Sequence, residues 1–380
     1  MIFHIANFTK TVIISYFVKN NNRDFMKLGI IGLTGSGKTT LFNSLSKAKG
    51  SGDKNISAGK RLNIKIVPVP DERLEKLEQI FKPKKKTPAY VEFVDIPGLE
   101  KSGKGAGNQF LSNIREVDAL VHVVRCYESS SNIPLEDIEV IDLELIVSDL
   151  ESIEKRIKAI EKQTRNISTQ IKTEAEILKK IKEGMENGQP ARNAGLLPDE
   201  IKIIKSMGLL TLKPVIYCAN IAESDIDKDE EKLLFIRDIE EYAQREKSEV
   251  LTVCAKTEEE ISQLESEDKE TFMWDLGIKE SALDKLVKSS YKILGLISFL
   301  TTGPDEVRAW TIKKGDKAPA AASIIHSDIE RGFIRAETIS FSTFIEMGSF
   351  IKAKEKGLLR SEGKQYIVND GDIIDFRFNV

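Results

Sequence analysis

The sequence predicts an α/β protein in which a doubly wound sheet is interrupted by a helical coiled-coil hairpin and followed by a small α+β domain. From residue 26 to about 130, strand-like apolar runs alternate with helical segments, as in open parallel sheets. A Glu/Lys-rich stretch then repeats apolar residues at the spacing of a coiled-coil seam. From Ile297 the pattern becomes short strands with one or two helices. A chain of 380 residues has room for two or three such domains.

The composition is that of a globular protein, with 41% hydrophobic and 31% charged residues. A formal net charge of −3 gives no overall electrostatic case for binding nucleic acid. No apolar run approaches the roughly 18 residues of a membrane span, and three scattered cysteines point to the reducing cytoplasm. Residues 1–25 lack the features of a signal peptide, and Met26 stands directly before the first strand. We expect this N-terminal extension to be disordered or not translated.

The first strand, residues 27–31, leads into a loop that defines the chemistry. Gly32-Leu33-Thr34-Gly35-Ser36-Gly37-Lys38-Thr39-Thr40 matches G-x-x-x-x-G-K-[ST] at every defined position, and a helical pattern follows it. Glycines let successive N–H groups point at phosphate oxygens, and the helix N-terminus adds its dipole. The residues assigned to the nucleotide here are Gly35, Ser36, Gly37, Lys38, Thr39 and Thr40. Lys38 would reach the β- and γ-phosphates as a catalytic cation, and Thr39 would ligate Mg2+. The loop predicts a P-loop NTPase domain.

Later strands at 64–69, 90–95, 119–124, 215–220 and 250–255 continue the sheet, with a helix over 71–81. Asp95-Ile96-Pro97-Gly98 ends one strand and matches D-x-x-G, in which Asp95 would hold Mg2+ through water and the Gly98 N–H would sense the γ-phosphate. Asn220-Ile221-Ala222-Glu223 occupies the place of the base-reading N-K-x-D, and Cys254-Ala255-Lys256 that of S-A-K. Residues 50–62 suit a switch segment. Together these matches, in order, predict a GTPase-type nucleotide domain over 26–136 and 207–296.

Two departures from the GTPase pattern carry information. Glu223 replaces the aspartate that accepts hydrogen bonds from guanine, and adenine offers neither of those donors. The substitution weakens the case for guanine without proving adenine. Leu99 follows Gly98 where Ras-type enzymes place the glutamine that orients the attacking water. Hydrolysis must therefore use another group or be slow.

The insertion, residues 137–206, predicts an antiparallel helical hairpin. Residues 166–169 would turn the chain back, although one long dimerising helix is the alternative. The seam residues are Ile146, Leu150, Ile153, Ile157, Ile160, Ile167, Ile171, Leu178, Ile181 and Met185. The C-terminal domain, residues 297–380, should contain strands at 297–300, 309–312, 332–339, 366–368 and 373–378. Asn369-Asp370-Gly371 predicts a hairpin turn between the last two.

Several long stretches add a resemblance to these motifs. They are Val67-Pro68-Val69-Pro70-Asp71-Glu72-Arg73-Leu74, Phe93-Val94-Asp95-Ile96-Pro97-Gly98-Leu99, Gly107-Asn108-Gln109-Phe110-Leu111, His122-Val123-Val124-Arg125-Cys126, Glu306-Val307-Arg308-Ala309-Trp310-Thr311 and Phe376-Arg377-Phe378-Asn379-Val380. From Met26 to Val380 the chain resembles the YchF/Obg-like ATPase subfamily of translation-factor-related P-loop proteins. The resemblance implies ATP in preference to GTP, a coiled-coil arm and a C-terminal TGS domain of β-grasp type. It also implies association with ribosomes, with a groove flanked by the arm and the TGS domain that would receive RNA or a ribosomal surface. We expect a monomer and, on the ribosome, the large subunit as its partner.

The chain also departs from that family. Gly59 stands where the family's switch carries a threonine for Mg2+, although Ser57 is nearby. The loop at 129–134 lacks the histidine thought to assist hydrolysis. We therefore predict a slow ATPase switch. The alternatives are a nucleotide-gated ribosome- or RNA-binding module with negligible hydrolysis and a GTPase of ribosome assembly.

Overall fold

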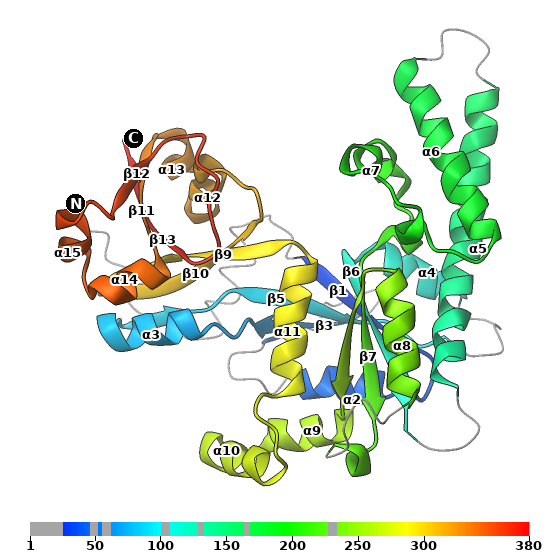
Figure 1. Cartoon of the computed structure of the whole chain (residues 1–380), viewed down its shortest axis with the longest axis horizontal. Helices are drawn as coiled ribbons and strands as arrows, with labels where there is room; N and C mark the ends of the chain where they lie inside the picture. Colours follow the sequence, from blue (N-terminus) through cyan, green and yellow to red (C-terminus); the bar gives the residue numbers. More distant parts are fainter. Residues whose placement is uncertain are drawn as a thin grey trace.

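Figure 1 shows the computed structural model, which describes residues 26–45, 52–54, 62–99, 107–127, 133–162, 168–226 and 234–379. The predicted N-terminal extension, residues 1–25, lies outside the described residues. Two sheets, a helical hairpin that projects from one of them, and the covering helices make up the fold. None of the described helices combines the length and apolarity needed to cross a bilayer.

The larger sheet has seven strands in the order β2-β3-β5-β1-β6-β7-β8. Its strands are β1 (Lys27–Ile31), β2 (Gly52–Lys54), β3 (Asn63–Pro68), β5 (Tyr90–Asp95), β6 (Ala119–Cys126), β7 (Val215–Ile221) and β8 (Glu249–Val253). The five strands from β5 to β8 in this order are parallel, and β2 and β3 are antiparallel at one edge. The predicted α/β class is confirmed, but the sheet is mixed and not parallel throughout.

The antiparallel edge arises from the connection between β3 and β5. Helix α3 (Glu72–Phe81) and strand β4 (Lys85–Thr87) leave the first sheet, and β4 pairs with β10 (Glu306–Lys313) of the second. At the end of α3, Phe81 stacks on Phe344 with the ring centroids 5.7 Å apart. Because this connection does not cross the face of the first sheet, β5 returns antiparallel to β3.

Helices cover both faces of the first sheet. Strand β1 illustrates this: Leu28 and Ile30 belong to one buried cluster with Leu41 of α2 (Lys38–Ser44), and Ile31 belongs to another. The first cluster is completed by α9 (Ala255–Gln263) and α11 (Ala282–Ile293), and the second by α4 (Gly107–Arg115) and α8 (Leu234–Arg245). Strands buried on both faces are those of a doubly wound sheet.

The predicted hairpin is formed by α5 (Pro134–Glu161) and α6 (Thr169–Glu186), which lie side by side where they project from the sheet (Figure 1). The first turns of α5 pack on the sheet itself through Ile138, Ile141 and Leu145. The predicted seam residues that pack together between them are Ile146, Leu150, Ile153, Ile157, Leu178, Ile181 and Met185. Predicted seam residue Ile167 lies outside the described residues. Glu174, which interrupts the seam, accepts two hydrogen bonds of 2.7 Å from Arg156. The alternative of one long helix is therefore wrong.

The second sheet has the order β12-β11-β13-β9-β10-β4. Its other strands are β9 (Leu296–Thr301), β11 (Phe333–Ser340), β12 (Arg360–Glu362) and β13 (Asp372–Phe378), and its helices are α12 (Ala318–Ile325), α13 (Ser327–Arg331), α14 (Phe341–Met347) and α15 (Phe350–Glu355). The parallel contact between β13 and β9, with the β9–β10 hairpin, is the arrangement of a β-grasp domain.

The predicted strand at 366–368 is wrong. Ile367 makes one isolated bridge with Lys317, and the Val368 N–H donates to Asp316. Residues 369–371 therefore form a turn that precedes β13 and do not close a hairpin. The domain limits drawn at 136/137, 206/207 and 296/297 remain a proposal.

Candidate nucleotide-binding site

The phosphate loop lies between β1 and α2, as predicted. Gly37 is the N-cap of α2 and has a left-handed backbone with φ of 91°. A Cβ at this position would stand 2.1 Å from Nδ2 of Asn220, so only glycine fits. Thr39 and Thr40 occupy the first turn of α2, where Thr39 is exposed and Thr40 is half-buried. The loop therefore presents backbone N–H groups and two hydroxyls at a helix N-terminus.

Lys38 is buried, with 8% of its surface exposed, and it reaches Gly98 of the D-x-x-G stretch. A Cβ on Gly98 would stand 2.5 Å from the Lys38 Nζ atom, so Gly98 leaves room for the amine. Burial lowers the Lys38 pKa, and the charge of Asp95 opposes that shift. For Asp95 the direction is opposite: burial raises the pKa of its carboxyl group, and the positive charge of Lys38 opposes that rise. A phosphate group would stabilise the charged form of this partly desolvated lysine.

The Leu99 side chain is not exposed beside the phosphate loop, where a glutamine that orients the attacking water would stand. Its side chain is 4% exposed and packs in the core with Leu33 and Ile96. Its carbonyl oxygen accepts from the Thr34 N–H at 3.1 Å, which joins the start of the phosphate loop to the end of the D-x-x-G stretch. The leucine therefore has a packing role here.

The variant Leu99→Gln should not accelerate nucleotide hydrolysis, because the new amide would point into the core. We expect it to lower the free energy of unfolding by about 2–4 kcal/mol through lost apolar burial and an unpaired amide. Urea denaturation measures this loss. Leu197→Gln is the matched control, because Leu197 is 66% exposed and its change should be near zero. A stable Leu99→Gln protein with faster turnover would contradict this account.

Asn220 connects the phosphate loop to the other predicted base-binding stretch. Its Nδ2 donates to the Ser36 carbonyl at 3.0 Å, and its Oδ1 accepts from the Ala255 N–H at 2.9 Å. Ile221 is buried beside it, and Cys254 is the N-cap residue of α9. The structure thus brings together the loop, the N-x-x-E stretch and the C-A-K stretch, which are far apart in the sequence.

Glu223 lies in the short helix η5 (Glu223–Asp225) that follows β7. Its carboxylate accepts a hydrogen bond of 2.7 Å from Lys256, and both side chains are about half exposed or more. The pair stands at the edge of the site, where a GTPase aspartate would accept from guanine. Here the carboxylate already has a cationic partner from the C-A-K stretch.

Sequence reasoning missed one loop contact. The Tyr127 hydroxyl donates to the Gly35 carbonyl at 2.6 Å. Tyr127 directly follows β6, so the signal available in the sequence was its place at the same sheet edge as Asp95 and Asn220. The predicted switch residues Ser57 and Gly59, and residues 129–132, lie outside the described residues.

The donor set at the loop fits magnesium. Thr39 offers a hydroxyl and Asp95 a carboxylate, and Mg2+ prefers oxygen ligands while keeping several waters and substrate phosphates. Among the described residues no group of three His, Cys, Asp or Glu side chains could hold a metal alone. The two residues therefore suit a metal bound together with a phosphorylated ligand.

The sheet, the loop and the strand-end residues define a P-loop NTPase of the GTPase type. Residues 27–181 match the family described as 50S ribosome-binding GTPase, and residues 296–379 match the YchF-GTPase C-terminal family, described as a protein of unknown function. The chain belongs to the YchF family.

Individual relatives show the same membership. The chain is 47% identical over 363 residues to the ribosome-binding ATPase YchF of Bacillus subtilis, covering 93% of this chain and 99% of that protein. It is 42% identical to the protein of the same name from Haemophilus influenzae, with equal coverage. The structure of the Schizosaccharomyces pombe YchF GTPase superposes with a TM-score of 0.83 at 30% identity, covering 94% of this chain and 99% of that one.

Proposed function

We propose that this protein is an ATP-binding and slowly hydrolysing P-loop switch that associates with the ribosome in the cytoplasm. The proposal depends mainly on one observation. The buried Lys38 amine lies against Gly98, and Asn220 holds the phosphate loop through a hydrogen bond to the Ser36 carbonyl. The names of the bacterial relatives, ribosome-binding ATPase, support both the activity and the partner.

The reaction is ATP plus water to ADP plus phosphate. Lys38, the loop amides and the Gly98 N–H stabilise negative charge on the transferring phosphoryl group. Thr39 and Asp95 would hold Mg2+, which would neutralise phosphate charge when bound. Since Leu99 is buried, the attacking water is oriented by backbone groups or by a partner, which makes the intrinsic rate low.

The base-binding side favours adenine through the pairing of Glu223. Guanine presents two donors to the aspartate of an N-K-x-D motif, whereas Glu223 is engaged by Lys256 at 2.7 Å. Adenine has no donor that needs this carboxylate. The rest of the proposed base-binding surface is formed by Asn220, Ile221, Cys254 and Ala255.

Glu223→Asp should raise the affinity for GTP relative to ATP by about fivefold or more, because a shorter carboxylate leaves Lys256 and can accept from guanine. Titration of both nucleotides by calorimetry measures the ratio. Glu223→Gln removes the charge and should leave the ratio unchanged. Equal ratios in Glu223→Asp and the native protein would contradict the role given to Glu223.

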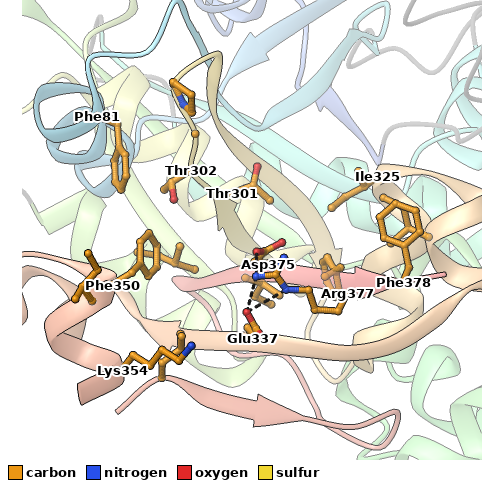
Figure 2. Close-up of a pocket in the computed structure, with 18 residues that line it drawn as sticks. Phe81, Thr301, Thr302, Ile325, Glu337, Phe350, Lys354, Asp375, Arg377 and Phe378 are labelled. Carbon is orange, nitrogen blue, oxygen red and sulfur yellow. Dashed lines mark hydrogen bonds and ion pairs between the residues drawn. The ribbon is translucent and has the colours of Figure 1, made fainter. Parts of the chain in front are cut away.

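The C-terminal TGS domain and the arm are the proposed contact surfaces for the ribosome, at its large subunit, with the protein as a monomer. A pocket of about 650 Å3 opens between β13, the β9–β10 turn and α15 (Figure 2). Arg377 in this pocket is paired with Glu337 at 2.8 Å and Asp375 at 2.9 Å, so it offers little to an RNA phosphate.

RNA contact is better supported at the lysines around α15. Four exposed lysines have no ion-pair partner among the residues that the structure describes: Lys352, Lys354, Lys356 and Lys364. Arg360, which lies between Lys356 and Lys364 in the sequence, is different, because it pairs with Glu362 and lies over the Tyr366 ring. Four unpaired lysines give this end of the domain a local positive charge that suits phosphate.

A second candidate is a nucleotide-gated ribosome- or RNA-binding module with negligible hydrolysis, and the buried Leu99 favours it. A third is a GTPase of ribosome assembly, which the family description for residues 27–181 favours. Phosphate release from the purified protein separates the three, with ATP and GTP in parallel and with and without ribosomes. We expect slow release from ATP that exceeds release from GTP. If no phosphate were released under any condition, both hydrolase hypotheses would be excluded and the binding module would be supported. Faster release from GTP than from ATP would support the GTPase.

A further inference from the structure

Two side chains, each at the end of a different strand, donate hydrogen bonds to carbonyl groups of the phosphate loop. Asn220 at the end of β7 binds the Ser36 carbonyl at 3.0 Å, and Tyr127 after β6 binds the Gly35 carbonyl at 2.6 Å. A Cβ on Gly37 would stand 3.8 Å from the Tyr127 hydroxyl and 2.1 Å from the Asn220 amide. Both groups therefore close around the same turn of the loop.

Gly35 needs such a restraint more than its neighbours do. It is exposed, its φ is +81°, and no atom lies within 4 Å of the position a Cβ would take. Glycine also has the largest conformational freedom to lose when a loop becomes ordered. Among the described residues, the Tyr127 hydroxyl is the side chain that donates to this peptide.

The Gly35–Ser36 peptide is held at both ends, because its carbonyl accepts from Tyr127 and its N–H, on Ser36, donates to the Leu33 carbonyl at 3.2 Å. In the next peptide the Ser36 carbonyl accepts from Asn220, so the N–H of that peptide, on Gly37, points the opposite way and can face a phosphate. A rotated Gly35–Ser36 peptide would lose both of its bonds and would change the direction of the Gly37 N–H. We propose that Tyr127 is a positioning residue that pre-organises the phosphate loop through its hydroxyl. This inference rests on the proposed nucleotide binding at the same loop.

The test compares Tyr127→Phe with the native protein by equilibrium titration with Mg-ATP, ADP and GTP. We expect all three to bind about threefold to tenfold more weakly, because the loop is common to them and one hydrogen bond is lost. The thermal midpoint without nucleotide should stay within about 2 °C. Tyr366→Phe, which loses a hydroxyl bond to Asp372 in the C-terminal domain, is the matched control and should bind normally.

A second variant tests the reason for the effect. Asparagine tolerates positive φ and has less freedom than glycine, and space for its side chain exists at position 35. In the Gly35→Asn background, Tyr127→Phe should therefore cost less affinity than in the native loop. Unchanged affinity in Tyr127→Phe, or loss confined to one base, would overturn the inference. No nucleotide binding by the native protein would instead overturn the proposed function.

Discussion

Replacing Lys38 with alanine should weaken Mg-ATP binding by about 100-fold or more. Lys38 is the buried cation beside Gly98 and Asp95, and two charge-assisted contacts to phosphates are each worth about 1.5–3 kcal/mol. The variant should fold normally, because burial already disfavours the charged amine and its removal relieves that cost. Calorimetric titration measures the affinity.

The control for this prediction is Lys256→Ala. Lys256 also lies near the nucleotide site, but its side chain is 68% exposed and it pairs with Glu223. It should keep ATP affinity within about threefold, since an exposed pair contributes little. If Lys38→Ala bound ATP as well as Lys256→Ala, the loop would not be the phosphate site.

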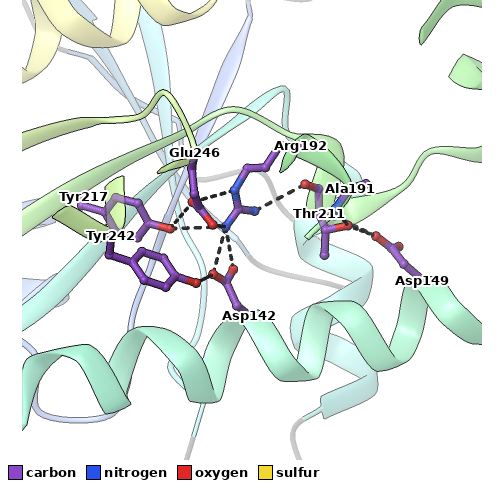
Figure 3. A network of polar contacts seen from close by, with 8 residues as sticks. All are labelled: Asp142, Asp149, Ala191, Arg192, Thr211, Tyr217, Tyr242 and Glu246. Atoms are coloured by element: carbon purple, nitrogen blue, oxygen red, sulfur yellow. Dashed lines mark hydrogen bonds and ion pairs between the residues drawn. The ribbon is translucent and has the colours of Figure 1, made fainter. Parts of the chain in front are cut away.

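The largest expected effect on stability comes from Arg192→Met. Arg192 joins the base of the arm to the nucleotide domain (Figure 3). Its Nη2 donates to both oxygens of Asp142 in α5 at 2.9 Å, and its Nε donates to Glu246 at 2.8 Å. Tyr217 of β7 donates to Glu246 at 2.6 Å, and Tyr242 of α8 donates to Asp142 at 2.8 Å. Among the residues that the structure describes, Arg192 is thus the cation that this buried cluster offers to its two carboxylates.

Without the guanidinium, two buried carboxylates lose their cation, which costs about 3–5 kcal/mol of unfolding free energy. Burial raises the Glu246 pKa and Arg192 opposes that rise, so in the variant the folded pKa should rise further above its unfolded value. Unfolding would then release a proton, and stability would fall as pH increases. Urea denaturation at about pH 5 and pH 8 should show the larger loss at the higher pH.

Arg237→Met provides the control for Arg192→Met. Arg237 also pairs with a carboxylate, Glu241, but the two side chains of this pair on α8 are 69% and 56% exposed. It should cost about 1 kcal/mol or less. If both variants lost the same free energy of unfolding, the burial of the Arg192 cluster would make no extra contribution to stability.

The sequence predicted those features that depend on local spacing. The loop, Asp95, Asn220 and Ala255 could be predicted because each lies at the end of a strand or just after it, and parallel strands bring their carboxyl ends to one edge. The apolar seam of the arm could also be predicted, because the spacing of its residues repeats within a short stretch of sequence.

Contacts between distant residues could not be predicted in this way. The cluster around Arg192 joins residues 142, 192, 217 and 246, and no motif relates their positions. Tyr127 was missed because its hydroxyl acts on Gly35, which is 92 positions away. The antiparallel β3 was missed because the helix after it packs on the other sheet, as Phe81 shows.

Equilibrium titration of the purified protein with Mg-ATP and Mg-GTP tests the central claim most directly. The claim is that the loop at residues 32–40 binds a nucleoside triphosphate and that the Asn220–Glu223 stretch favours adenine. We expect ATP to bind at one site per chain and more tightly than GTP, with both lost in Lys38→Ala. Tighter binding of GTP would contradict the adenine assignment, and no binding of either nucleotide would contradict the site itself.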